Sequence, residues 1–197
     1  MIKVLLLDAD DVLIHQERFS VVLDRDFGIS LEATKEFFTG PFQDCLEGKA
    51  DLKDAVTPYL TIWGCTKGVD AFLDLWFQRE YNLNHELFDY IKQLQQRGIH
   101  CFLATNQEKY RVAYILEKMG LNSIFDRAFA SSNLGYKKPS PEFFAVIFKN
   151  LENVKKEEIL FWDDKKENIE AAKSFGIHAE LYVSPADFIE KMDKYIA

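Results

Sequence analysis

The sequence predicts an α/β fold in which a doubly wound parallel sheet carries an α-helical insertion after its first strand. Short apolar runs of strand length recur along the chain, and both of their faces are apolar, as in parallel strands buried on both sides. Helical patterns separate these runs from about residue 85 onward, and this alternation indicates βαβ units. The expected strands are 3–7, 99–104, 127–131, 158–162 and 178–183.

Amphipathic stretches between these runs supply the expected helices, because their apolar residues recur at helical spacing. Gly98, Gly120 and Gly176 fit the C-terminal ends of helices, and Ser140-Pro141 fits a helix start. The expected helices cover 85–97, 107–119, 141–151 and 165–175.

The stretch from about 14 to 84 differs from the rest because it contains no convincing strand. We therefore predict two units: a core formed by 1–13 and 85–197, and a helical insertion formed by 14–84. Candidate helices of the insertion lie near 17–27, 31–38, 51–62 and 68–80.

Composition restricts the partners of the chain. Its 197 residues carry a net charge of −8 and no stripe of Lys or Arg, so no nucleic acid is expected as a partner. No apolar stretch approaches the roughly 20 residues that span a membrane, and the start lacks a signal-peptide pattern. The 3 cysteines match no zinc spacing, so we expect reduced thiols in a cytoplasmic protein. The oligomeric state stays open.

Three carboxylates follow the first predicted strand within four positions: Asp8, Asp10 and Asp11. Carboxylates this close together repel one another unless a positive charge lies between them. A hard cation with a preference for oxygen ligands, such as Mg²⁺, would satisfy it. The alternative is a solvated acidic turn, which is less typical directly after a buried strand.

Two further clusters offer groups that could bind an anion. Thr105 and Asn106 follow the second strand and could donate hydrogen bonds to phosphoryl oxygens, although capping of the next helix is the competing interpretation. Lys137 and Lys138 precede Pro139 in a stiff loop and could neutralise a phosphate, whereas a lone loop lysine is usually solvated.

Asp163 and Asp164 repeat the acidic pattern after the fourth strand, where N-capping by Asp164 is the alternative. All four clusters lie at or just beyond the C-terminal ends of apolar strands, which is where open α/β sheets bind ligands. We expect them to converge on one site.

In their order, these clusters resemble the four motifs of the haloacid dehalogenase-like superfamily: an Asp-x-Asp, a Ser or Thr, a Lys and an acidic pair. Residues 117–144 and 160–176 also resemble the phosphatases of that superfamily. The resemblance covers about 1–13 and 85–185, and it implies a Rossmann-like core with a small helical cap at the position of the insertion.

The resemblance implies specific roles for the first two motifs. Asp8 would be the nucleophile that becomes an aspartyl phosphate, and Asp10 would protonate the leaving alcohol and later deprotonate water. Thr105, Asn106 and Lys138 would bind the phosphoryl group; Lys138 is preferred to its neighbour because the superfamily's lysine directly precedes a proline.

The resemblance also implies a magnesium site. Asp8 and Asp163 would bind Mg²⁺ through their carboxylates and Asp10 through its backbone carbonyl, with Asp164 as a ligand or a support for one. The implied function is a Mg²⁺-dependent phosphohydrolase (phosphatase) that acts on a small phosphorylated metabolite.

Other functions share parts of this pattern. A phosphosugar mutase of the β-phosphoglucomutase type has all four motifs. A receiver-like phospho-acceptor module has its acidic pair first in the chain, not last. Dehalogenases of the superfamily attack carbon and lack the second aspartate of the first motif, so Asp10 favours phosphate chemistry.

Asp11 departs from the superfamily pattern, which usually has glycine at this place. Aspartate tolerates unusual backbone dihedrals better than most residues, so we expect the turn to be preserved. The resemblance implies that the cap sets substrate specificity. By their position alone, the candidate pocket residues of the cap are His15, Gln16, Arg18, Phe42 and Gln43.

Overall fold

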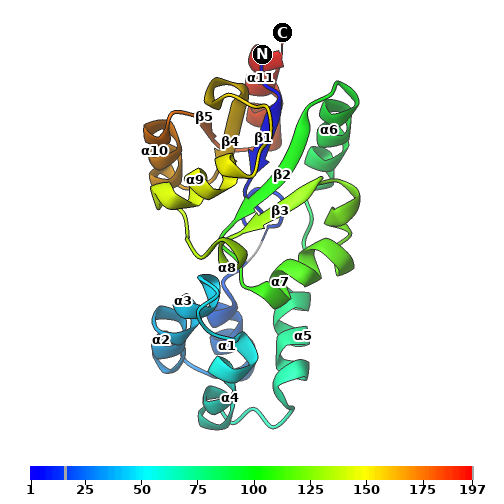
Figure 1. Ribbon diagram of the computed structural model, residues 1–197. Coiled ribbons are helices and arrows are strands. Elements are labelled where there is room, and N and C mark those ends of the chain that lie inside the picture. Colours follow the sequence, from blue (N-terminus) through cyan, green and yellow to red (C-terminus); the bar gives the residue numbers. More distant parts are fainter. Residues whose placement is uncertain (16, 197) are drawn as a thin grey trace.

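The computed structural model describes residues 1–15 and 17–196, and its centre is a five-stranded parallel sheet in the order β3-β2-β1-β4-β5 (Figure 1). Every neighbouring pair is parallel; Leu6 of β1, for example, aligns with Phe102 of β2 and Phe161 of β4. The strands are β1 (Val4–Leu7), β2 (His100–Thr105), β3 (Arg127–Ala130), β4 (Ile159–Asp163) and β5 (His178–Leu181). The predicted α/β class with a doubly wound parallel sheet is confirmed.

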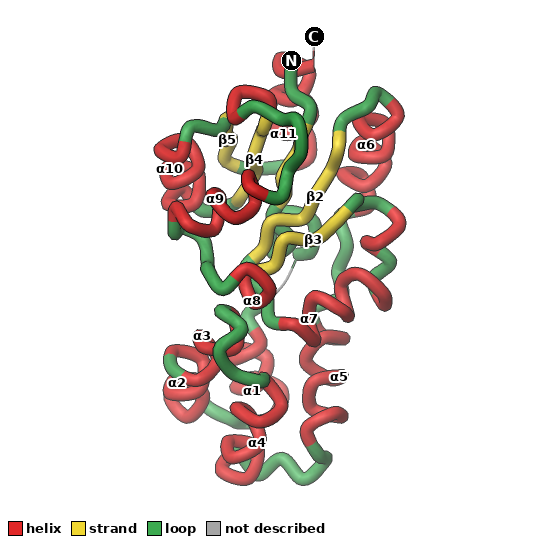
Figure 2. Tube along the Cα trace, viewed as in Figure 1, coloured by secondary structure: helices red, strands yellow, loops and turns green. Residues whose placement is uncertain are grey.

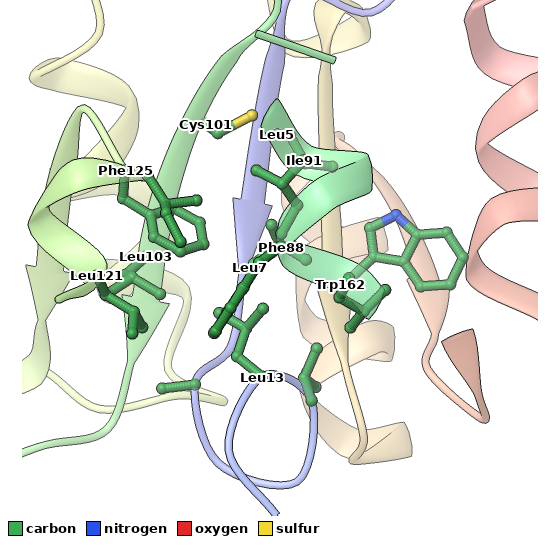
Figure 3. Packing of buried hydrophobic residues seen from close by; sticks show 14 of the residues in the cluster. Leu5, Leu7, Leu13, Phe88, Ile91, Cys101, Leu103, Leu121, Phe125 and Trp162 are labelled. Carbon is green, nitrogen blue, oxygen red and sulfur yellow. The ribbon is translucent and has the colours of Figure 1, made fainter. Parts of the chain in front are cut away.

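Both faces of the sheet are buried, because alternate side chains of each strand enter different cores. Leu5 and Leu7 of β1 belong to the core on one face (Figure 3), whereas Val4 and Leu6 belong to the core on the other. The first core is covered by α6 (His85–Gln96) and α11 (Pro185–Ile196), and the second by α9 (Pro141–Lys149) and α10 (Lys166–Phe175).

The helix expected over 107–119 is interrupted. It consists of α7 (Lys109–Ala113) and a π-helical turn at Tyr114–Lys118. The wider turn lets Ile115 pack in the core under the sheet while the ring of Tyr114 contacts Phe77 of the insertion, with ring centroids 5.4 Å apart. A short helix, α8 (Ser131–Leu134), and the final α11 were not anticipated from the sequence.

The insertion is helical and has a hydrophobic core of its own, rich in aromatic rings such as Phe37, Trp63 and Trp76. It lies beyond the C-terminal ends of the strands, and its described residues form helices and loops but no strand (Figure 2). Its helices are α1 (Phe19–Phe27), α2 (Leu31–Thr39), α3 (Pro41–Leu46), α4 (Leu52–Ile62) and α5 (Val69–Arg79).

The two linkers between the insertion and the core run side by side. The backbone amide of His15 donates to the carbonyl of Asn82 at 2.8 Å, and the amide of Asn84 donates to Leu13 at 2.8 Å. These bonds support the proposed division into a core of 1–13 and 85–197 and an insertion of 14–84. Among the described residues, no helix is long and apolar enough to cross a membrane.

A buried ion pair joins the insertion to the core. Arg111 of α7 places Nη2 3.2 Å from Oε2 of Glu80, just after α5, and its Nη1 donates to the carbonyl of Phe77 at 3.2 Å. Trp76 donates through Nε1 to Oε1 of Glu80 at 2.8 Å. Burial raises the pKa of Glu80 despite the Arg111 charge, so the ionised carboxylate depends on this partner.

Removal of one charge of the Arg111–Glu80 pair should therefore lower the free energy of unfolding more than removal of both charges. Arg111→Met leaves the Glu80 carboxylate buried without its cation, and it should lower the free energy of unfolding by about 3–5 kcal/mol. The double variant Arg111→Met/Glu80→Gln should recover most of that loss, because an amide keeps the bond from Trp76. Urea unfolding of the wild type, of Arg111→Met, of Glu80→Gln and of the double variant measures this coupling; strictly additive losses would contradict it.

Candidate active site

Three strand ends and one loop meet at the edge of the sheet that faces the insertion. Asp8 follows β1, Thr105 ends β2 and Asp163 ends β4, and these strands are neighbours with β1 in the middle. Lys138 arrives from the loop after α8. All four side chains are buried, with at most 5% of each residue exposed, so interactions among them are little weakened by solvent.

The ammonium group of Lys138 lies between two carboxylates. Its Nζ is 2.9 Å from Oδ1 of Asp8 and 2.6 Å from Oδ2 of Asp163. Asn106 fixes the backbone of this lysine: Oδ1 accepts from the amide of Lys138 at 2.9 Å, and Nδ2 donates to its carbonyl at 3.0 Å. Both polar groups of the Asn106 side chain thus hold the lysine loop, and its role in phosphoryl binding stays a prediction.

One lysine does not balance the charge of this site. Burial, opposed by Lys138 and reinforced by Asp163 and Asp10, raises the pKa of Asp8 to about 7. Burial acts on Asp163 in the same direction, but Lys138 and the hydrogen bonds to this carboxylate hold its pKa below the ordinary value. The pKa of Lys138 is raised by its two carboxylates against the effect of burial. The site therefore keeps an excess of negative charge that favours a cation.

The acidic groups are arranged to hold that cation. One carboxylate oxygen from each of Asp8, Asp163 and Asp164 lies within 4.8 Å of the others. Burial raises the pKa of Asp164, which again shows a carboxylate that lacks a sufficient positive neighbour. A donor set made only of oxygen suits Mg²⁺ better than a softer metal. These three carboxylates among the described residues therefore fit a magnesium ion.

The turn after β1 brings Asp10 back toward the same edge. The amides of Leu13 and Ile14 both donate to the carbonyl of Ala9 at 2.9 Å, which closes the turn. Asp11 has a φ of 58°, in the left-handed region that favours glycine. The turn is preserved with aspartate at this place, as the sequence predicted, because aspartate is among the residues that tolerate this conformation.

The competing capping interpretations of two motifs do not hold. The N-terminus of α7 is capped by Glu108, whose carboxylate accepts from the amides of Tyr110 and Arg111, so Thr105 is not its cap. The hydroxyl of Thr105 is buried and has no hydrogen-bond partner among the described residues. A buried hydroxyl without a partner is costly unless a ligand completes it, which suits a donor to a phosphoryl oxygen.

Asp164 does not cap α10 either, because no side chain caps this helix. The start of α10 is attached to Asp163 instead: Oδ1 accepts from the amide of Lys165 at 2.9 Å and from Nδ2 of Asn168 at 2.8 Å. Asn168 is buried and was missed in the sequence, where nothing distinguishes it from an ordinary helical residue.

Gln107 is the second residue that the sequence did not reveal. Its Nε2 donates to Oδ2 of Asp10 at 2.5 Å, across a separation of 97 positions in the chain. The available signal was its place directly after Thr105 and Asn106. This motif therefore contributes three consecutive side chains to the site.

A cavity of about 650 Å³ lies between the insertion and the core and reaches Asp10. Of the pocket residues expected by position, Arg18, Phe42 and Gln43 line it. His15 is not among its lining residues, and Gln16 lies outside the described residues. This volume is within the usual range for small-molecule sites.

Lys137, expected to be a solvated neighbour of Lys138, has a different role. Its Nζ lies 2.9 Å from Oε1 of Gln43 and 3.2 Å from Oε1 of Glu47, and its side chain is only 22% exposed. Lys137 therefore ties the lysine loop to α3 of the insertion, while Lys138 points to the carboxylates.

The doubly wound sheet thus carries an acidic cluster suited to a metal ion, a buried lysine and a buried hydroxyl at its carboxyl edge. Residues 2–176 match the model of the haloacid dehalogenase-like hydrolase family, and the chain belongs to that family. The resemblance stated from the motifs is thereby confirmed.

Comparison with individual proteins gives the same result. The chain is similar to the D-ribitol-5-phosphate phosphatase of Bacteroides thetaiotaomicron, with 26% identity over 160 residues that cover 78% of this chain and 77% of that protein. A predicted HAD-like family hydrolase from Porphyromonas gingivalis superposes with a TM-score of 0.83 at 24% identity, over 100% of this chain and 98% of that one.

A HAD family enzyme from Bacteroides thetaiotaomicron, solved with magnesium and inorganic phosphate, has a TM-score of 0.79 at 18% identity, over 93% of this chain and 95% of that one. Both structural likenesses lie below 25% identity and bear on the fold alone.

The charge imbalance predicts that Mg²⁺ stabilises the folded protein. At a concentration 100 times its dissociation constant, an ion that binds only the folded state adds about 2.7 kcal/mol to the free energy of unfolding. Asp163→Asn should abolish most of this gain, because it removes one charge and one ligand. Asp89→Asn, at an exposed position of α6, should leave the gain intact.

Thermal unfolding with and without Mg²⁺ measures the effect in each variant. If Mg²⁺ raised the unfolding temperature of Asp163→Asn as much as that of the wild type, the ion would not bind at this acidic cluster.

Proposed function

We propose that the protein is a Mg²⁺-dependent phosphatase that hydrolyses a small phosphorylated metabolite through an aspartyl phosphate on Asp8. The observation that carries this proposal is the buried Lys138 between Asp8 and Asp163, together with the buried hydroxyl of Thr105 at the same edge of the sheet, which has no hydrogen-bond partner among the described residues. One edge of the sheet thus offers a carboxylate as the proposed nucleophile, an acidic cluster as the proposed metal site and two donors for the phosphoryl group. The similarity to a sugar-alcohol phosphatase supports the same chemistry.

In the first step, a carboxylate oxygen of Asp8 attacks phosphorus, and the bond between phosphorus and the ester oxygen breaks. Asp10 gives its proton to that leaving oxygen, so the product departs as a neutral alcohol. Thr105 and Lys138 hold the phosphoryl oxygens during this transfer. A magnesium ion, when bound, supplies positive charge that offsets the phosphoryl charge and favours the ionised form of Asp8.

In the second step, a water molecule attacks the phosphorus of the aspartyl phosphate. Asp10 accepts a proton from this water, the bond between phosphorus and the Asp8 oxygen breaks, and inorganic phosphate forms. Asp8 returns to a carboxylate and Asp10 to its protonated form, so the cycle is closed. The same side chain thus acts first as an acid and then as a base.

The cavity beside Asp10 is the proposed site of the alcohol part of the substrate. Arg18, Phe42 and Gln43 contribute to its wall, together with core residues Asn106 and Gln107. Its volume suits a phosphorylated metabolite of a few carbon atoms, and D-ribitol 5-phosphate is a suitable first compound to assay. The three free cysteines, Cys45, Cys65 and Cys101, fit the reducing compartment that we propose, the cytoplasm.

The covalent mechanism predicts different defects for the two aspartates of the first motif. Asp8→Asn removes the nucleophile, so no phosphoenzyme should form and turnover should be lost. Asp10→Asn keeps the nucleophile but removes the acid and base, which should lower turnover about 10²–10⁴-fold. With an aryl phosphate, whose leaving group needs no proton, Asp10→Asn should accumulate phosphoenzyme. Intact-protein mass spectrometry would detect one added phosphoryl group.

Near-normal turnover by Asp8→Asn would contradict the proposal. Glu167→Gln, at an exposed position in the first turn of α10, is a matched control that should behave as wild type. Stimulation of the wild-type enzyme by a sugar bisphosphate would instead favour the phosphosugar mutase, which shares these motifs and needs its phosphoenzyme for transfer.

A further inference from the structure

A hydrogen bond between two distant loops holds the carboxylate of Asp10. Gln107 donates through Nε2 to Oδ2 of Asp10 at 2.5 Å, and only 6% of Gln107 is exposed. Both residues line the cavity between insertion and core. The amide therefore lies beside the group to which the proposed reaction assigns two proton transfers.

The backbone of Gln107 is itself held. Its carbonyl accepts from Oγ of Ser131 at 3.4 Å and from the amide of Ser132 at 3.3 Å, both in α8. The insertion lies close to that helix: a Cβ atom at Gly48, where φ is +70°, would lie only 2.1 Å from the carbonyl oxygen of Ser132. The backbone that carries the amide donor is thus held against α8, which in turn contacts the insertion.

From this geometry we infer that Gln107 is a positioning residue that orients Asp10 for both proton transfers. The inference rests on the proposed phosphatase mechanism. An amide N–H is accepted by Oδ2 when Asp10 is ionised and also when the proton is on its other oxygen. The same contact therefore persists while Asp10 changes from acid to base, and it restricts rotation of the carboxylate throughout.

The chemistry of neighbouring residues supports this assignment. Thr105 is the proposed donor to the phosphoryl group, Asn106 holds the lysine loop, and Gln107 donates to Asp10. Three consecutive side chains at the end of β2 thus have three separate tasks in the proposed site. Gln107 does not need to contact the substrate for this task, so its loss should impair proton transfer more than substrate binding.

A double-mutant cycle tests the inference. Gln107→Met is close to the same shape but has no donor, and it should lower kcat for an alkyl phosphate about 10–100-fold with little change in KM, because misplacement of a catalytic group is costly. In the Asp10→Asn background the same substitution should lower kcat less than about twofold, since the group that it positions is already lost.

The leaving group gives a readout that a merely structural role would not change. With an aryl phosphate, Gln107→Met should keep a normal rate of phosphoenzyme formation and show a slow second step, so that phosphoenzyme accumulates. Rapid-quench measurements of phosphoenzyme also count the competent active sites, which corrects for any fraction that fails to fold. Gln93→Met, at an exposed position of α6, is the matched control with wild-type kinetics expected.

Equal losses from Gln107→Met in the wild-type and Asp10→Asn backgrounds would overturn the inference, because the amide would then act independently of Asp10. An unchanged kcat in Gln107→Met would overturn it as well. A failure of the proposed function is distinguishable, because the wild type would then hydrolyse no phosphate ester, or Asp8→Asn would keep near-normal turnover.

Discussion

The site depends on one ammonium group placed where three strands of the sheet end. Lys138 contacts Asp8 and Asp163 at 2.9 and 2.6 Å, and it is buried with them. Without it, two carboxylates on adjacent strands would repel each other in a medium that screens charge poorly. With it, the repulsion between these carboxylates is reduced. The cluster of Asp8, Asp163 and Asp164 still carries excess negative charge, which favours a divalent cation.

The remaining parts of the site serve to keep that lysine and its partners in place. Asn106 fixes the backbone of Lys138, Asn168 fixes Asp163, and Gln107 fixes Asp10. Amide side chains suit this task because they donate and accept without adding charge. The insertion completes the arrangement from the opposite side, since it closes a cavity over Asp10 and contacts the lysine loop through Lys137.

The sequence sufficed for the class of fold and for the residues at strand ends, because parallel strands necessarily end at one edge and Asp8, Thr105 and Asp163 follow or close such strands. It did not suffice for contacts that arise only when distant loops meet. The bond from Gln107 to Asp10 spans 97 positions, and the place of Gln107 beside Thr105 and Asn106 does not reveal which residue it contacts. The packing of Lys137 on the insertion likewise depends on how the two units fit, which local propensity does not encode.

The central claim is that Asp8, held beside Lys138, accepts a phosphoryl group while Mg²⁺ completes the acidic cluster. A crystal structure of the protein with Mg²⁺ and beryllium fluoride, which mimics a phosphoryl group on aspartate, tests it most directly. The account predicts beryllium trifluoride bonded through beryllium to a carboxylate oxygen of Asp8, with Thr105 and Lys138 at hydrogen-bond distance from fluorine and Mg²⁺ about 2.1 Å from oxygens of Asp8 and Asp163. An adduct on another residue, or an ion bound away from this cluster, would contradict it.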